Sequence, residues 1–156
     1  MASYVFDHLG KEISMMPEVM VSTLWTWNKA ENDFPTPPLP EEIRGQQRID
    51  LVLFTPQDVP KNEQRIWCLI EFKRDSRVGG DITKMKSLLP LFDGCDFGAA
   101  CGVVEVEKYP NWFNKERAEA TARGERFVTS QPWNAIIANK ARSFVVFAHL
   151  FATPES

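Results

Sequence analysis

Two neighbouring segments rich in apolar residues constrain the fold of this chain more than any other feature. In residues 47–55, apolar side chains occupy both faces of an extended chain, and residues 64–73 repeat the pattern. The polar loop from Pro56 to Glu63, which contains two prolines, separates them. Strands that are apolar on both faces are typical of a sheet covered on both sides. The short loop predicts that the two strands form an antiparallel pair.

The rest of the chain predicts helices and strands in mixed order. Helices are expected at 17–30, 81–92, 112–123 and 133–141, and further strands at 97–106 and 143–151. Prolines between residues 32 and 40 exclude helix and central strand there, so this stretch is an extended connector. Gly98 would let a helix lie close on the sheet, and Gly124 would end the third helix. The sequence therefore predicts an α/β fold with a mixed central sheet flanked by helices.

Length and charge limit the classes of protein to which the chain can belong. Its 156 residues suit one domain, and its 44% hydrophobic and 25% charged residues are those of an ordinary globular protein. It carries 18 basic and 21 acidic residues, a net charge of −3. This balance argues against tight, non-specific coating of DNA. It does not exclude an enzyme that cleaves DNA, because bound cations can neutralise a nuclease's own carboxylates.

The cysteines and histidines give no sign of a disulfide framework or a zinc site. Cys68, Cys95 and Cys101 are odd in number and include no CxxC pair, as in proteins of a reducing compartment. His8 and His149 lie at opposite ends of the chain. The N-terminus lacks the pattern of a signal peptide, and the longest apolar run is far shorter than a membrane span. We therefore expect a cytoplasmic protein without membrane contact.

Three charged residues within the paired segments are the candidates for chemistry. The sequence Glu71-Phe72-Lys73 is a weak pattern by itself, since a chain of this length should contain roughly one by chance. Its position gives it weight, because alternation places Glu71 and Lys73 on one face at the end of an apolar strand. Asp50 interrupts the preceding strand in the same way. Buried charges are costly unless they are paired or bind an ion, so we expect these three groups to meet.

The residue types suit magnesium-dependent hydrolysis. Mg²⁺ prefers hard oxygen ligands and retains several waters. Two carboxylates and a backbone carbonyl are therefore enough ligands from the protein. Such an ion polarises a phosphate and lowers the pKa of a bound water. A neighbouring lysine can orient or deprotonate that water. Without an ion, Lys73 would instead neutralise the acids as a salt bridge.

At these residues the chain resembles the PD-(D/E)xK nuclease superfamily, whose fold is restriction-endonuclease-like. The matching stretches are residues 48–52, residues 68–74 and the following helix, and the likeness covers about residues 14–106. The resemblance implies that Asp50 and Glu71 bind the metal with the carbonyl of Phe72, and that Lys73 is the catalytic lysine. Ile49 replaces the usual proline before the first acid. The last third of the chain would form peripheral helices and a strand of the same domain.

Four further residues are candidates for supporting roles. By resemblance, Glu18 on the first helix could be an additional metal ligand, although helical spacing equally favours a solvated acid. Arg74, Arg77 and Lys84 lie near the signature and could contact a phosphate backbone. Alternatively, these three side chains are ordinary solvated surface residues.

The five tryptophans divide by their surroundings. Trp27 and Trp67 lie in apolar patterns and are expected in the core. Trp25, Trp112 and Trp133 stand among polar residues, where they could stack on unpaired bases or form a partner surface. Half-buried aromatic residues would show the same pattern.

Together these observations predict a nuclease dependent on Mg²⁺ or Mn²⁺ that hydrolyses phosphodiester bonds, with DNA preferred over RNA and endonucleolytic cleavage. One alternative is a catalytically inactive domain of the same fold that binds nucleic acid or protein. Another is an unrelated interaction protein in which the three charged residues do not meet. A homodimer or a partner protein is compatible with each.

Overall fold

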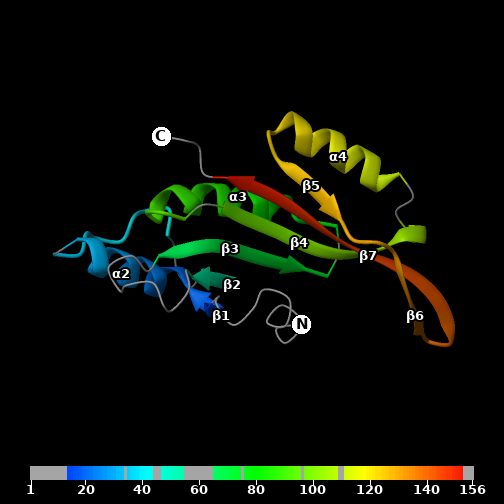
Figure 1. Ribbon diagram of the computed structural model, residues 1–156, viewed down its shortest axis with the longest axis horizontal. Coiled ribbons are helices and arrows are strands. Elements are labelled where there is room, and N and C mark those ends of the chain that lie inside the picture. The colour runs from blue at the N-terminus through cyan, green and yellow to red at the C-terminus, as the bar shows by residue number, and fades with distance from the viewer. Residues whose placement is uncertain are drawn as a thin grey trace.

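The computed structural model describes residues 14–33, 35–43, 47–54, 65–74, 76–95, 97–108 and 111–152. These form a mixed seven-stranded sheet and three α-helices (Figure 1). The strands, in their order across the sheet, are β1 (Ser14–Met20), β2 (Arg48–Phe54), β3 (Ile66–Lys73), β4 (Phe97–Glu105), β7 (Lys140–Ala152) and β5 (Arg126–Thr129), with β6 (Trp133–Ile137) also paired to β7.

The strand directions follow from the connections between strands. The pairs β1–β2 and β2–β3 are antiparallel, whereas β3 and β4 are parallel because the helix α3 (Gly79–Leu88) crosses between them. β7 runs antiparallel to β4, β5 and β6. The predicted antiparallel pair and the predicted mixed α/β sheet are therefore confirmed.

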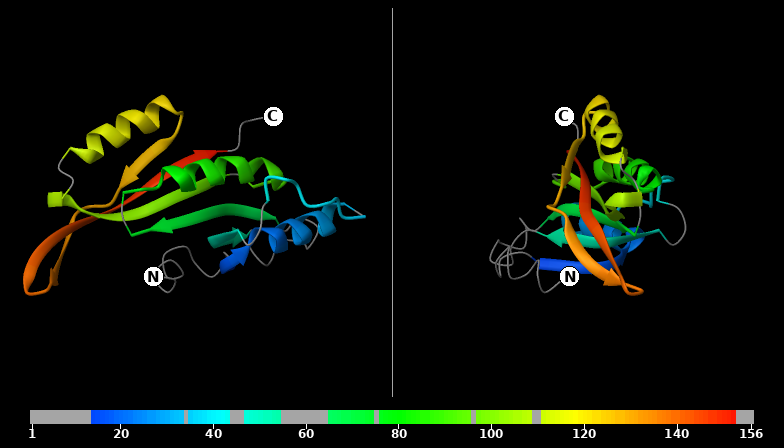
Figure 2. Two further views of the ribbon diagram at one scale, coloured as in Figure 1. Left: turned by 180° about the vertical axis from the view of Figure 1, so that it is seen from behind. Right: turned by 90° about the vertical axis from the view of Figure 1, so that its right-hand side faces the viewer.

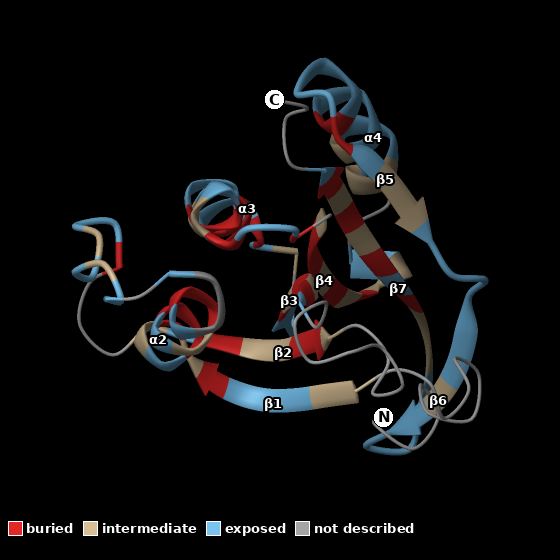
Figure 3. Cartoon of the chain, turned by 60° about the vertical axis from the view of Figure 1, so that its left-hand side comes forward, coloured by how far each residue is buried: buried red, intermediate tan, exposed pale blue. Residues whose placement is uncertain are grey.

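The helices α2 (Val21–Asn32), α3 and α4 (Trp112–Ala122) lie on the same side of the curved sheet (Figure 3). The hydrophobic core fills the space between this side and the helices, and Met85 and Leu88 of α3 are fully buried in it. None of the three described helices is both long and apolar enough to cross a membrane. Within the described residues no helix covers the opposite face, which differs from the two-sided cover that the apolar strands predicted.

Gly98 allows the segment after α3 to lie close on β4, as the sequence predicts. A Cβ atom at this position would lie 2.7 Å from the ring of Phe151 and 3.2 Å from the side chain of Leu89, in the short 3₁₀ turn η2 (Leu89–Leu91). Both distances are below normal van der Waals contact. The predicted strand 97–106 and helices 81–92 and 112–123 correspond to β4, α3 with η2, and α4.

The predicted first helix, 17–30, is wrong at its N-terminal end. Residues 14–20 form the edge strand β1, in which Met16 pairs with Val52, and the helix begins at Val21. The methionines that match a helical stripe belong to this strand. Pro17 is tolerated because an edge strand leaves one row of backbone groups unpaired.

The predicted helix 133–141 is also wrong. The segment forms the hairpin of β6 and β7, with Ala138 and Asn139 in its two-residue turn at φ of 48° and 61°. Positive φ at both turn positions is the geometry that suits the twist of a tight hairpin. β7 is also longer than the predicted strand 143–151. The hairpin projects beyond the helices (Figure 2).

Candidate active site

Pairing of β2 and β3 brings the two predicted metal-binding carboxylates to one face of the sheet. Leu51 pairs with Ile70, so continuation of the register by one residue places Asp50 opposite Glu71. Oδ2 of Asp50 accepts a hydrogen bond of 2.7 Å from the backbone N–H of Phe72. The Asp50 carboxylate thereby replaces the next backbone acceptor at the end of the strand pair.

Glu71 is buried beneath α3, with 4% of the residue exposed. Its Oε1 accepts a hydrogen bond of 2.5 Å from Nζ of Lys84 on α3, and Lys84 also donates to the carbonyl of Arg48. Burial raises the pKa of Glu71, and the negative charges of Asp50 and Asp81 raise it further, while Lys84 opposes the shift. Glu71 is therefore held in surroundings that disfavour its own negative charge.

Lys73 shares the face of Glu71, two residues further along β3. Its Nζ lies 3.3 Å from Oδ1 of Asp81, in the first turn of α3, and its side chain is 43% exposed. The hydrogen bond and the charge of Asp81, followed by the charges of Glu71 and Asp50, raise the pKa of Lys73. This lysine is therefore a protonated, solvent-accessible cation beside the carboxylates.

Asp50, Glu71, Lys73, Asp81 and Lys84 thus form one group, called the active-site cluster below. The structure brings together all three predicted catalytic residues on one face. Asp81 was missed as a member, since the sequence suggested a helix cap and the structure has no side-chain cap there. Its three-residue spacing to Lys84 places both on one helix face, which is the signal that could have found it. Oδ2 of Asp81 is buried without a hydrogen-bond partner.

The other predicted site residues lie around this cluster. Glu18 belongs to β1, has φ of 50°, and its 77% exposed side chain lies 3.8 Å from Arg48. It is therefore a solvated acid on a strand and does not project from a helix. Arg74 and Arg77 are exposed in the segment between β3 and α3. Lys84, expected to touch substrate, is engaged with Glu71.

The donor set determines which metal the site could take. Within the described part of the chain, no three His, Cys, Asp or Glu side chains are grouped so as to hold a metal ion. A site here therefore depends on Asp50, Glu71 and the backbone carbonyl of Phe72. Two neighbouring carboxylates, of which Asp50 disfavours the charge of Glu71, suit a hard divalent cation that keeps several waters.

A second charged group, the His149 network, lies on the same face. It contains Lys86 of α3, Glu116 in the middle of α4, Arg123 directly after α4, Glu125 before β5, and His149 of β7. Ala100 of β4 pairs with both Glu71 and His149, so the active-site cluster and the His149 network are separated by one small residue.

Within the His149 network the charges are closely paired. Glu125, whose side chain is fully buried, contacts Nε of Arg123 at 3.0 Å, Nζ of Lys86 at 2.7 Å and Nδ1 of His149 at 3.2 Å. Nε2 of His149 lies 3.3 Å from Oε1 of Glu116 without hydrogen-bond geometry. Burial lowers the pKa of His149 against the opposing effect of the two glutamates.

The tryptophans divide differently from the sequence prediction. Trp25 is buried and its Nε1 lies 3.4 Å from the carbonyl of Pro37. Trp112 packs on Phe127 and Phe147. These two are core or half-buried residues, whereas Trp133 is 45% exposed.

No protein-family model matches the chain, and no curated protein matches its sequence.

Proposed function

We propose that the chain is a metal-dependent nuclease with a PD-(D/E)xK-type fold, which hydrolyses DNA phosphodiester bonds at the active-site cluster. The observation that carries this proposal is the position of Asp50 and Glu71 on adjacent antiparallel strands, with Lys73 beside them. The order of α2, β2, β3, α3 and β4 also agrees with the core of that family, which is a helix, an antiparallel pair, a crossing helix and a further strand, while β1 precedes this order. In this proposal Asp50, Glu71 and the carbonyl of Phe72 hold Mg²⁺ or Mn²⁺.

The bound ion would supply Lewis-acid polarisation of the phosphate and a water of lowered pKa. Lys73 serves as a fixed cation, because its raised pKa keeps it protonated at neutral pH. Its exposed ammonium group is able to bind a non-bridging phosphate oxygen and to orient a water for attack. Asp81 holds the ammonium group in place through the 3.3 Å contact.

Asp50 has a structural role as well as a proposed ligand role. One of its oxygens is fixed by the N–H of Phe72, which orients the carboxylate toward the end of β3. Lys84 compensates the charge of Glu71 in the protein without a metal. Because an ammonium group and a divalent cation are both attracted to Glu71, we expect them to compete for it.

The Lys84–Glu71 ion pair also favours a second candidate function. A carboxylate that is already neutralised by a lysine needs no metal, as in a catalytically inactive domain that binds nucleic acid or protein. The net charge of −3 agrees with this alternative.

Cleavage assays distinguish the nuclease from the inactive binding domain. The protein is incubated with single-stranded, duplex and branched DNA and with RNA, with Mg²⁺, with Mn²⁺ or with EDTA. We expect metal-dependent cutting of DNA that falls by at least about 100-fold in Asp50→Asn and in Lys73→Ala, the scale for loss of one transition-state contact. Asp50→Asn retains an acceptor for the N–H of Phe72, so its fold should persist. Lys115→Ala removes an exposed charge on α4 and is the matched control.

Each outcome has a defined meaning. Binding of DNA without cutting supports an inactive domain that binds nucleic acid. Neither binding nor cutting contradicts both the nuclease and that domain, and favours a domain that binds protein. Cutting that survives in Lys73→Ala contradicts the role given to this lysine. Circular dichroism and thermal unfolding confirm that each variant is folded.

A further inference from the structure

Within the described residues, no strand pairs with the outer edge of β6, and this edge is uncharged and largely apolar. Its sequence, Trp-Asn-Ala-Ile-Ile, contains no charged residue. Trp133 is 45% exposed, Ile136 80% and Ile137 44%. Among the described strands, β6 pairs with β7 alone. An exposed hydrophobic edge strand is a ready template for pairing with another chain.

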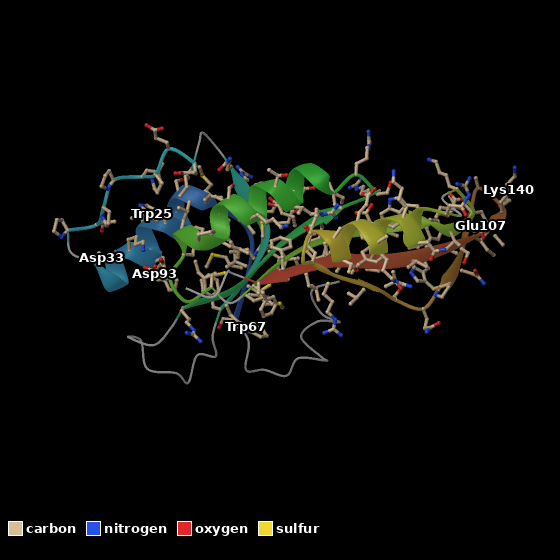
Figure 4. The ribbon with its side chains drawn as sticks, turned by 90° about the horizontal axis from the view of Figure 1, so that it is seen from above. Trp25, Asp33, Trp67, Asp93, Glu107 and Lys140 are labelled. Carbon is tan, nitrogen blue, oxygen red and sulfur yellow. The ribbon has the colours of Figure 1, made fainter. Side chains whose placement is uncertain are left out.

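This edge belongs to a preformed arm. β7 pairs with β4 from Phe144 onward, so residues 140–143 pair with β6 alone and the hairpin projects from the body (Figures 1 and 2). Figure 4 shows Lys140 with Glu107 at the end of the molecule opposite Trp25. Stacking of Trp133 on Phe144, with ring centroids 5.0 Å apart, ties the arm to the sheet.

The backbone of β6 has bonding groups that point away from β7. Ile137 and Lys140 flank the two-residue turn, and in such a hairpin the flanking residues exchange both backbone hydrogen bonds. Pairing then alternates along the strand. Asn134 and Ile136 therefore direct their N–H and C=O groups toward the open edge. These four groups are the ones that an added strand would use.

The opposite edge of the sheet is protected. In β1, Pro17 has no N–H to donate, and Glu18 carries a charge and a φ of 50° that interrupts the regular strand. These devices are the ones that natural sheets use against edge-to-edge association. β6 has no proline and no charge.

We propose that β6 pairs antiparallel with β6 of a second copy of this chain, forming a two-fold symmetric dimer with one continuous sheet. In such a pair each strand lies beside an identical one, so any charge near the centre of β6 would lie close to the same charge of the second copy. The absence of charge in β6 removes this repulsion. Centred on Ala135, the pair would place Trp133 opposite Ile137 of the second copy, an aromatic–β-branched cross-strand contact. The inference does not depend on nuclease activity.

Sedimentation equilibrium between about 1 and 100 µM tests the dimer, a range that spans the affinities expected of a small interface. We expect a monomer–dimer equilibrium in the wild-type chain. Ile136→Lys should raise the dimer dissociation constant at least tenfold, because two like charges would then lie diagonally across the strand pair, one residue to either side of its centre at Ala135. Ala118→Lys adds the same charge to an exposed position on α4 and should leave the equilibrium unchanged. Equal thermal midpoints show that both variants are folded.

A mixing experiment tests the identity of the partner. Ile136→Lys and Ile136→Glu should each be monomeric, whereas their equimolar mixture should form dimers, since opposite charges are then diagonal neighbours across the two strands. A wild-type chain that remains monomeric at 100 µM overturns the proposal. An Ile136→Lys variant that still dimerises, or a mixture that does not, overturns it as well.

Discussion

The active-site cluster and the His149 network lie side by side under the same helix, yet they shift the pKa values of their buried carboxylates in opposite directions. Burial raises the pKa of Glu71 despite its contact with Lys84. Burial also acts to raise the pKa of Glu125, but hydrogen bonds from Arg123 and Lys86 outweigh it and lower that pKa. Glu125 is stabilised as an anion and Glu71 is not.

This difference separates a structural network from a candidate site. Glu125 has a cation from α3, a cation from α4 and a histidine from β7, so its charge connects three elements. Glu71 contacts one cation, Lys84, and has two neighbouring acids, an arrangement that stays unfavourable until a further positive charge arrives. Carboxylates in unfavourable surroundings are enriched at functional sites, whereas fully paired ones hold the fold together.

The largest effect on stability should come from Glu125→Ala. This variant leaves Arg123, Lys86 and His149 around a buried void, and removal of one partner from a buried charged group costs about 3 kcal/mol. Urea unfolding measures the loss. Glu119→Ala removes an exposed partner of Arg123 and should cost less than about 1 kcal/mol. Equal losses in the two variants would show that the His149 network does not stabilise the fold.

The His149 network should also make stability depend on pH between 7 and 5. The pKa of His149 is lowered in the folded protein, so the unfolded chain binds the proton more readily once the pH falls below the ordinary value of 6.5. Stability contributed by neutral His149 is thus present above this pH and is lost as the pH falls toward the folded pKa. Glu116 and Glu125 moderate the loss, and Arg123 adds to it.

Unfolding free energies of the wild type and His149→Gln, measured from pH 7 to 5, test this expectation. The variant has no group that titrates at this position, so its curve should be flatter. Parallel curves for the two proteins would assign the pH dependence to other groups.

How far the sequence predicts this molecule depends on the range of the interactions. Alternation within β2 and β3 is local, and it correctly placed Asp50 and Glu71 on one face. The His149 network was not predicted, because it depends on where α3 and α4 cross the sheet. Such crossings are set by tertiary packing.

The wrong start of the first helix and the wrong helix 133–141 have the same kind of cause. Met16 and Met20 match helical spacing, but pairing with β2 selects a strand. In the 133–141 segment, apolar residues at positions 133, 136 and 137 imitate a helix. The adjacent β-branched residues Ile136 and Ile137, followed by Asn139, were the available signals for a strand and a turn.

The smallest effect, and the one that most sharpens the contrast between the two carboxylates, is expected from Glu71→Gln. A group whose pKa is raised on folding contributes stability below its unfolded pKa of about 4.5 and loses that contribution as the pH rises through the folded pKa. At pH 8 the ionised carboxylate of Glu71 therefore destabilises the folded wild-type protein. Glutamine is neutral at every pH and still accepts a hydrogen bond from Lys84.

We therefore expect Glu71→Gln to raise the thermal midpoint slightly at pH 8, with the gain shrinking toward pH 4, while DNA cleavage is lost. Glu105→Gln, which removes a partly exposed partner of Arg142, is the matched control and should give no gain. Stabilisation with loss of activity is the pattern of a residue kept for function at the expense of stability. A destabilised Glu71→Gln at pH 8 would instead place Glu71 with Glu125, among the carboxylates that hold the fold together.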